Sequence, residues 1–296
     1  YTVLLGPESN SRFTVTGNVF IAQGVWAGLE YVCALQVSKK SLGWQWSIEI
    51  KNTTDDFIES DLFFVQDAGL KAITTGPNNE YYVSQYLERS ILEDKKYGSV
   101  ICCRQNMAEP VGNPWLIMAC KNRATSASVD GMQFYGKTYR ETGIPEGMLA
   151  SELGGEYAGE SSVLALQGKP VKLGPGNQSK IVFVTGYLPD HPEAISSTDL
   201  LRLSSLIPEF DEEVSFQDSD AFFAPDKNLF NTSAFLPVDD LNEQELIGFF
   251  GKERRYSEEK NGQLLSFFCR ENNHVVLRAK EINVDRPHAH IMQAKA

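Results

Sequence analysis

The chain lacks any long hydrophobic run. Among its 296 residues, no stretch comes near the roughly 20 consecutive apolar residues that a membrane helix needs, and no basic start precedes an apolar stretch as in a signal peptide. We therefore expect a soluble, cytoplasmic segment without a membrane partner. The chain opens at Tyr1 without a methionine, and we expect it to be part of a longer polypeptide.

Positive charge is scarce. Lys and Arg number 27 against 39 Asp and Glu, which leaves a formal net charge of −12. Proteins bind the phosphates of nucleic acids and anionic lipids through Lys and Arg, so this balance disfavours both as partners. The net charge neither favours nor disfavours binding of a neutral sugar.

The cysteines form no regular framework. There are five, an odd number, and two of them are adjacent in the sequence. They are Cys33, Cys102, Cys103, Cys120 and Cys269. This pattern favours reduced thiols in the cytoplasm over a secreted disulfide protein, and without a Cys-x-x-Cys pair it disfavours a thiolate zinc site.

Metal-binding patterns are weak as well. His288 and His290 alternate as on one face of a strand, but catalytic zinc needs a third protein ligand, and the other histidines are His191 and the distant His274. The acidic residues within 211–220 lack the Gly and terminal Glu of a calcium loop and are expected to form a solvated surface. We expect no metal and no cofactor in this segment.

Motifs of nucleotide binding and hydrolysis are missing too. The stretch Gly174-Pro175-Gly176 matches neither glycine-rich phosphate-binding pattern, and no Gly-x-Ser-x-Gly nucleophile elbow occurs. We expect a turn between two strands at this stretch. No residue of the chain is predicted to be catalytic.

The chain does contain repeated alternation of apolar and polar residues. Residues 12–21 and 44–51 alternate with a period of two, which is typical of half-buried strands. Further strands are expected at 31–37, 62–65, 99–103, 115–121, 163–166, 181–187, 264–268 and 274–277. Short strands separated by Gly, Asn and Asp turns predict a mainly β fold with a large antiparallel β-sandwich. Its core is expected to contain Phe13, Val15, Trp44, Trp46, Ile48, Phe183 and Val184.

The pattern changes after Pro192. Apolar residues follow an approximate helical spacing from Pro192 until Pro208, and a second helix is expected from Asp240 to near Tyr256, acidic at its start and basic at its end. We expect the helices to be confined to this region. The predicted division is a β-sandwich domain over 1–190, a helical linker over 191–260 and a β segment over 261–296.

The chain has four tryptophans, which could pack the core or stack on sugar rings. They are Trp26, Trp44, Trp46 and Trp115. The two near residue 45 share a strand with apolar residues and are expected in the core. Trp26 and Trp115 lie near expected loops and are the better candidates for sugar contact.

Three stretches carry a family resemblance. Residues 126–136, 170–176 and 180–187, in this order and spacing, resemble the N-terminal β-sandwich of inverting glycoside phosphorylases related to cellobiose phosphorylase and cyclic β-1,2-glucan synthase, glycoside hydrolase family 94. Gly131 stands where arginine is common in that family. The long insertions and the tail at 286–291 are most similar to 1,2-β-oligoglucan phosphorylases.

The resemblance implies a larger enzyme with an N-terminal β-sandwich, a helical linker, an (α/α)6 catalytic barrel and a small β cap. One carboxylic acid would protonate the glycosidic oxygen while inorganic phosphate attacks the anomeric carbon, so phosphate replaces the second carboxylate of an inverting hydrolase. The family's acid and phosphate ligands lie in the barrel, and this chain has no Asp-Trp-Asn-Asp type motif. The chain is expected to lead into that barrel as the noncatalytic portion.

The implied substrate is a β-1,2-glucooligosaccharide, with inorganic phosphate as co-substrate of the full enzyme and α-glucose 1-phosphate as product. Candidate substrate-binding residues on or beside the family-like stretches are Trp115, Asn113, Arg123 and Tyr135. An aromatic face with hydrogen-bonding groups suits a neutral glucan. The alternative is that these residues only pack strands and turns.

Two other functions stay open at this point. The chain could be a portion of cyclic β-1,2-glucan synthase or of a cellobiose-type phosphorylase. It could also be a free-standing carbohydrate-binding β-sandwich. A homodimer is compatible with each of them.

Overall fold

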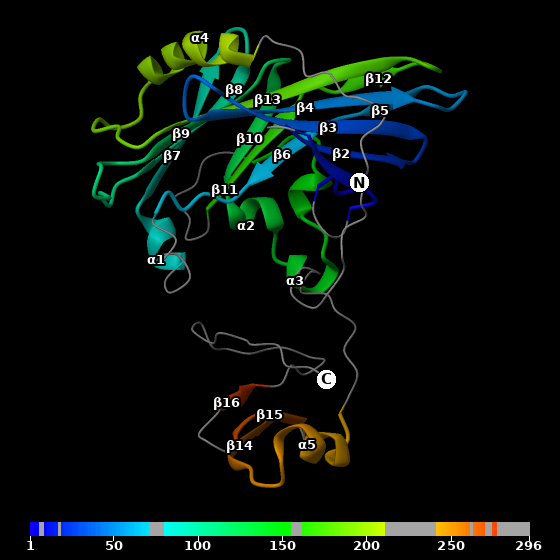
Figure 1. Cartoon of the computed structure of the whole chain (residues 1–296), viewed down its shortest axis with the longest axis vertical. Helices are drawn as coiled ribbons and strands as arrows, with labels where there is room; N and C mark the ends of the chain where they lie inside the picture. The colour runs from blue at the N-terminus through cyan, green and yellow to red at the C-terminus, as the bar shows by residue number, and fades with distance from the viewer. Residues whose placement is uncertain are drawn as a thin grey trace. The chain divides into compact units, whose positions relative to one another are not determined.

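The computed structural model describes residues 1–5, 9–16, 19–71, 80–154, 162–210, 241–260, 263–269 and 274–276 (Figure 1). The chain divides into two compact units, Tyr1–Thr232 and Ser233–Ala296. Within the described ranges, no helix combines the length and apolar character needed to cross a bilayer. The domain boundaries expected near 190 and 260 stay predictions.

An 11-stranded sheet dominates the described part of the first unit. Its strands are β1 (Arg12–Thr16), β2 (Val19–Trp26), β3 (Leu29–Val37), β4 (Gly43–Asn52), β6 (Phe63–Gln66), β7 (Leu87–Asp94), β8 (Gly98–Gln105), β9 (Trp115–Cys120), β10 (Ala124–Asp130), β11 (Ser162–Gly168) and β13 (Gln178–Leu188). Their order is β1-β2-β3-β4-β13-β9-β8-β10-β11-β6, with β7 beside β8. Two short strands, β5 (Ile58–Ser60) and β12 (Val171–Leu173), pair with each other.

The pairing is antiparallel apart from one contact. Among the strands that the structure describes, only β10 and β8 pair in parallel, at Ala124 and Gly98. Strand β13 lies in the middle, where Phe183 faces Trp46 of β4 on one side and Cys120 of β9 on the other. The predicted mainly β, antiparallel fold is confirmed.

Two hydrophobic clusters cover opposite faces of β13. Phe183 belongs to a cluster that draws residues from β2, β3 and β4 and also from β10 and β11, strands far apart in the sheet order. The ring of Phe64, on the last strand β6, lies 5.5 Å from that of Phe183. The sheet therefore closes over a sandwich-type core. Val184 points the other way, into a second cluster with the segment around Leu203.

The residues predicted to lie in the core differ in how deeply they are buried. Ile48, Phe183 and Val184 are buried as expected, whereas Phe13, Trp44 and Trp46 are half-buried. Val15 is 68% exposed, so its assignment to the core was wrong. It lies on β1, the edge strand with which the order begins, one residue from the end of that strand, and an edge strand has a paired neighbour on one side only.

The strand expected over residues 12–21 is two strands. It splits into β1 and β2, which form an antiparallel hairpin with Thr16 opposite Val19. Over residues 12–21 odd positions are apolar in both strands, so the sequence shows no break, yet pairing places Val15 opposite Phe20 and the odd positions of β1 share a face with the even positions of β2. The pattern alone could not reveal the reversal.

Helices occur outside the region between Pro192 and Tyr256, contrary to prediction. They are α1 (Glu80–Gln85), α2 (Gly131–Tyr135), α3 (Tyr139–Thr142) and the 3₁₀ turn η2 (Glu146–Met148). Helix α2 follows β10 directly, and the side chain of Asp130 caps it by accepting from the backbone N–H of Gln133 at 3.0 Å. Such helices are one or two turns long, too short to show a 3.6-residue period.

The first expected helix starts later and ends later than predicted. It consists of η3 (Ser197–Arg202), α4 (Leu203–Leu206) and η4 (Ile207–Phe210). A capping box of Ser196 and Asp199 sets its start. Pro208 lies within η4 instead of limiting the helix, because the fixed φ of a proline, about −65°, is compatible with 3₁₀ geometry and the residue removes one backbone donor without ending the turn.

The second unit contains α5 (Glu243–Phe250) and an antiparallel sheet of β14 (Arg255–Lys260), β15 (Gln263–Phe268) and β16 (His274–Val276). Helix α5 is shorter than the predicted 240–256, since Gly251 with φ 80° forms its C-cap. Phe250 packs on the buried Phe267 with ring centroids 5.5 Å apart. The acidic residues within 211–220, and His288 and His290, lie outside the described residues.

Candidate functional site

The four candidate substrate residues do not form one site. Asn113 and Trp115 lie together at the start of β9, whereas Arg123 lies beyond its other end. Tyr135 ends α2, after the next strand. Only the first two are neighbours in the fold, and their substrate contact stays a prediction.

Trp115 is buried by the chain itself. Its side chain is 1% exposed, its ring stacks on that of His191 at 5.1 Å and 11°, and the guanidinium of Arg202 lies 5.5 Å from its centroid. A sugar ring could stack on Trp115 only after these groups moved away. The position therefore suits packing against the segment that follows β13.

Asn113 forms hydrogen bonds to two connections, the β8–β9 loop and the chain at 190–191 after β13. Its side-chain Nδ2 donates to the carbonyls of Gln105 at 3.0 Å and Asn106 at 3.3 Å. Its backbone N–H donates to Asp190 Oδ1 at 2.9 Å, and its carbonyl accepts from the N–H of His191 at 2.8 Å. Asn113 thus fixes the chain at 190–191 beside the β8–β9 loop.

Arg123 and Tyr135 have local roles. Arg123 is exposed, adopts φ 80° in the turn after β9, and donates from Nη1 to the carbonyl of Lys95 at 2.8 Å. Tyr135 is half-buried between Phe134 and Tyr139. Burial, and to a lesser extent Asp67 and Tyr139, raise the pKa of its hydroxyl to about 12, so the group stays protonated near neutral pH and can donate a hydrogen bond.

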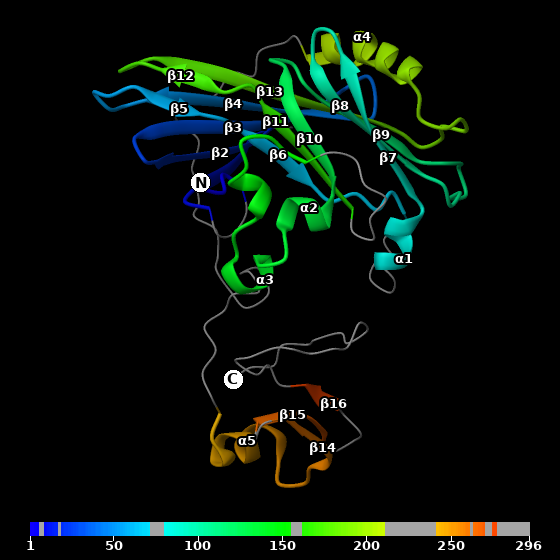
Figure 2. The same cartoon turned by 180° about the vertical axis from the view of Figure 1, so that it is seen from behind.

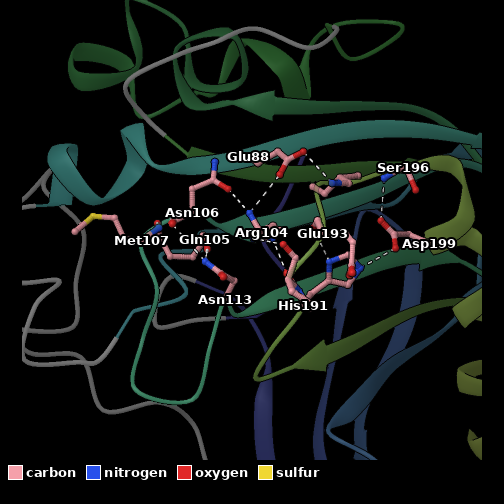
Figure 3. A network of polar contacts seen from close by, with 12 residues as sticks. Glu88, Arg104, Gln105, Asn106, Met107, Asn113, His191, Glu193, Ser196 and Asp199 are labelled. Atoms are coloured by element: carbon pink, nitrogen blue, oxygen red, sulfur yellow. Dashed lines mark hydrogen bonds and ion pairs between the residues drawn. The ribbon is translucent and has the colours of Figure 1, made fainter.

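A cluster of polar contacts is centred on Arg104 of β8, which is 8% exposed (Figure 3). Arg104 Nε donates to the carbonyl of His191 at 2.6 Å, and Nη2 donates to that of Pro192 at 2.9 Å. Nη1 contacts Asn106 Oδ1 and lies 3.8 Å from Glu88 Oε2. We call this cluster, with His191 and Asp199, the Arg104 network.

His191 and Asp199 form a buried pair within this network. His191 Nε2 lies 2.9 Å from Asp199 Oδ1, and Nδ1 lies 2.9 Å from the carbonyl oxygen of Glu193. Asp199 Oδ2 also accepts from the backbone N–H of Ser196 at 3.0 Å. Both ring nitrogens thus face oxygen atoms of the chain. Every polar atom of the pair is engaged.

The thiol of Cys102, near this pair, is not activated. The nearby Cys102 has a thiol pKa raised well above its ordinary value, first by burial and then by the negative charges of Asp199, Cys103 and Glu88. A buried, protonated thiol is unreactive. Among the described residues, no group of three potential metal ligands occurs. The geometry is that of a clamp.

Apolar contacts complete this clamp. Leu203, Leu206 and Phe210 are buried against Val184 and its neighbours on β8 and β9. A cleft of about 90 Å³ remains, bordered by Trp115, Arg202 and Glu209 among others. This volume is far less than the roughly 300–1,000 Å³ of a typical ligand pocket.

Arg104 and Asp199 were not among the residues predicted to form a site. Their signals were weak: an arginine within a strand of apolar residues, and the Ser196-x-x-Asp199 spacing of a capping box. His191 was considered only as a third metal ligand. The network becomes recognisable only when β8 and the segment after β13 are seen together (Figure 3).

Comparison with protein families gives two matches. Residues 1–185 match the SOGP N-terminal domain, and residues 251–296 match the glycoside phosphorylase supersandwich domain. The Arg104 network thus reaches beyond the first match, because His191 and Asp199 follow residue 185.

One relative agrees with these matches over nearly the whole chain. A 1,2-beta-oligoglucan phosphorylase of Listeria innocua serovar 6a is 27% identical over 298 residues, which cover 99% of this chain and 25% of that protein. The chain therefore spans about a quarter of its relative's length. Solved structures include a protein described as a kojibiose phosphorylase from the human microbiome (TM-score 0.41, 8% identity, 66% of this chain, 21% of that chain). Another is described as an aldose 1-epimerase from Escherichia coli K12 (TM-score 0.36, 8% identity, 61% of this chain, 69% of that chain).

Proposed function

Because this chain belongs to the SOGP N-terminal domain family, we propose that it is the noncatalytic N-terminal portion of an inverting β-glucoside phosphorylase. The proposed substrates are β-1,2-glucooligosaccharides and inorganic phosphate, and the product is α-glucose 1-phosphate. The relative from Listeria innocua, similar over 99% of this chain, supports this choice.

The succession of two family matches carries the proposal. A chain that has the SOGP N-terminal domain at 1–185 and then enters a glycoside phosphorylase supersandwich domain at 251 has the order of parts expected of such an enzyme. We infer that the catalytic acid and the phosphate ligands lie outside this chain.

The contribution of the chain is then structural and positional. The Arg104 network and the buried leucines hold residues 190–210 against the sheet, so this segment keeps a defined place on the first unit. Positioning of this kind lets a separate catalytic part work beside a rigid scaffold. The chemistry itself needs one carboxylic acid and the attacking phosphate.

The test compares the intact gene product with residues 1–296. The intact protein should release glucose 1-phosphate from β-1,2-glucooligosaccharides and phosphate, whereas the purified chain should release none. Turnover by the chain alone, abolished by one carboxylate substitution in it, would overturn the proposal. Phosphorolysis of cellobiose instead would support the cellobiose-type alternative, and glucan binding without phosphorolysis would support a free-standing binding module.

A further inference from the structure

Three connections meet at one end of the large sheet, where the tips of β3, β4 and β12 lie together (Figures 1 and 2). They are the turn at 27–28, the loop at 53–57 and the turn at 174–177. Thr53 N–H donates to the carbonyl of Gly28 at 2.8 Å, and Asn52 N–H donates to that of Asn177 at 2.9 Å. We call these three connections the Asn52 loop cluster.

Asn52 organises the cluster from inside. Its side chain is 0% exposed, and Nδ2 donates to the carbonyls of Asp56 at 2.7 Å and Leu173 at 3.0 Å. Its Oδ1 accepts from the backbone N–H of Thr54 at 2.9 Å and from the Thr54 hydroxyl at 2.8 Å. A carboxamide offers two donors and two acceptor sites, and all are used here. A fully satisfied buried group of this kind holds loops in one conformation.

This rigid cluster presents an aromatic ring to solvent. Phe57 is 82% exposed although it sits on an ordered loop. A Cβ added at Gly174 would lie 3.2 Å from Cε1 of Phe57 and 3.3 Å from Nδ2 of Asn177, so the ring and the amide border the same spot. Trp26, 36% exposed, ends β2 just before the 27–28 turn.

Polar groups surround the ring. The carboxamide of Asn177 is exposed and makes no hydrogen bond to another described residue, and Asp55 and Asp56 are exposed on the loop of Phe57. Together they offer an apolar face, amide donors and carboxylate acceptors. A pyranose ring complements this set, because it has an apolar C–H face and a rim of hydroxyls. The carboxylates and the net charge of −12 disfavour an anionic partner.

We propose that the Asn52 loop cluster is a carbohydrate-binding surface on which Phe57 stacks against a glucosyl ring of a β-glucan and Asn177 hydrogen-bonds its hydroxyls. The choice of a β-glucan rests on the proposed function. The surface is preorganised, so little conformational entropy is lost on binding. It gives the N-terminal unit a binding role in addition to its positional one.

The experiment is calorimetric titration of the purified 296-residue chain with linear β-1,2-glucan and with cellohexaose. Phe57→Ala should weaken glucan binding at least about tenfold, Asn177→Ala should weaken it less, and Phe57→Trp should retain it. The matched control is Phe249→Ala, which removes a 64% exposed ring from the second unit and should leave binding unchanged. Added salt should change the affinity little, because the ligand is neutral.

Three results would overturn the proposal. Absence of glucan binding by the unmodified chain, or equal binding by Phe57→Ala, overturns the proposal. If light scattering shows a dimer that Phe57→Ala dissociates, a second copy occupies the surface and the proposal is wrong. Glucose 1-phosphate release by the intact enzyme, measured separately, tests the proposed function independently: binding that depends on Phe57 would stand even if no phosphorolysis occurred.

Discussion

The indole of Trp115 and the imidazole of His191 stack at 5.1 Å, with an angle of 11° between their planes. This contact joins the start of β9 to the chain that leaves β13, and the Arg104 network surrounds it. Trp115 was a candidate for sugar contact, and its ring instead stacks on His191 and lies 5.5 Å from the guanidinium of Arg202. The consequences of this arrangement can be measured.

Truncation of Trp115 should be costly. Trp115→Ala removes a 1% exposed ring and should lower the free energy of unfolding by about 3–5 kcal/mol, measured by urea denaturation. Trp46→Ala should cost less, because Trp46 is only half-buried. The control is Leu201→Ala. Leu201 lies in η3 next to Arg202, its side chain is 73% exposed, and its truncation should change the free energy of unfolding by about 0.5 kcal/mol or less. Equal losses for Trp115 and Leu201 would contradict the packing described.

Removal of the Arg104 guanidinium should loosen the segment after β13. Arg104→Met leaves the carbonyls of His191 and Pro192 without their donors and should cost about 1–3 kcal/mol. Limited proteolysis should then cut near residues 190–210 sooner. Arg123→Met is the control, since that exposed arginine donates to one carbonyl and its loss should cost under about 1 kcal/mol. Unchanged proteolysis in Arg104→Met would speak against the clamp.

A side chain at Gly112 should disturb the same joint. Gly112 has φ 145°, and an added Cβ would lie 2.0 Å from Asp190 Oδ1, which accepts from Asn113 N–H. Gly112→Ala should therefore cost about 1–3 kcal/mol. Gly248→Ala within α5 meets nothing within 4 Å and should be neutral or stabilising by up to about 1 kcal/mol. Thermal unfolding of both variants measures these effects: Gly112→Ala should lower the melting temperature, and Gly248→Ala should leave it unchanged or raise it.

The buried thiols should resist modification. Burial raises the pKa of Cys33 and Cys103 to about 12 and that of Cys120 to about 11, from an ordinary value of 9.0. At about pH 8 these thiols should react with an aromatic disulfide reagent only slowly until the chain is unfolded. Rapid labelling of any of them in the native state would contradict their burial.

The same shifts predict a loss of stability in alkali. A thiol with a raised folded-state pKa contributes its full stability below the unfolded value of 9.0, and this contribution is lost as the pH rises toward about 12. Urea midpoints should therefore fall through this range. Substituting Cys33 by Ala should reduce the slope, because one titrating group is removed.

Several strands were predictable because their signal is local. Residues 44–51 alternate on a single strand, and β4 spans Gly43–Asn52 as expected. The β1–β2 hairpin was missed because odd positions are apolar both before residue 16 and over residues 19–21, so the sequence pattern continues across the reversal although the side-chain faces exchange. Helix α2 was missed because five residues are too few to show a helical period.

The sequence by itself determined the fold class, the position of most strands and the resemblance to glycoside phosphorylases, since each depends on residues close together in the chain. Only the tertiary structure decided which side chains meet. Arg104 and His191 are 87 positions apart, and Asn52 and Leu173 are 121 apart. No periodicity encodes such contacts, because they depend on how the strands are ordered in the sheet and on which connections come together at its ends.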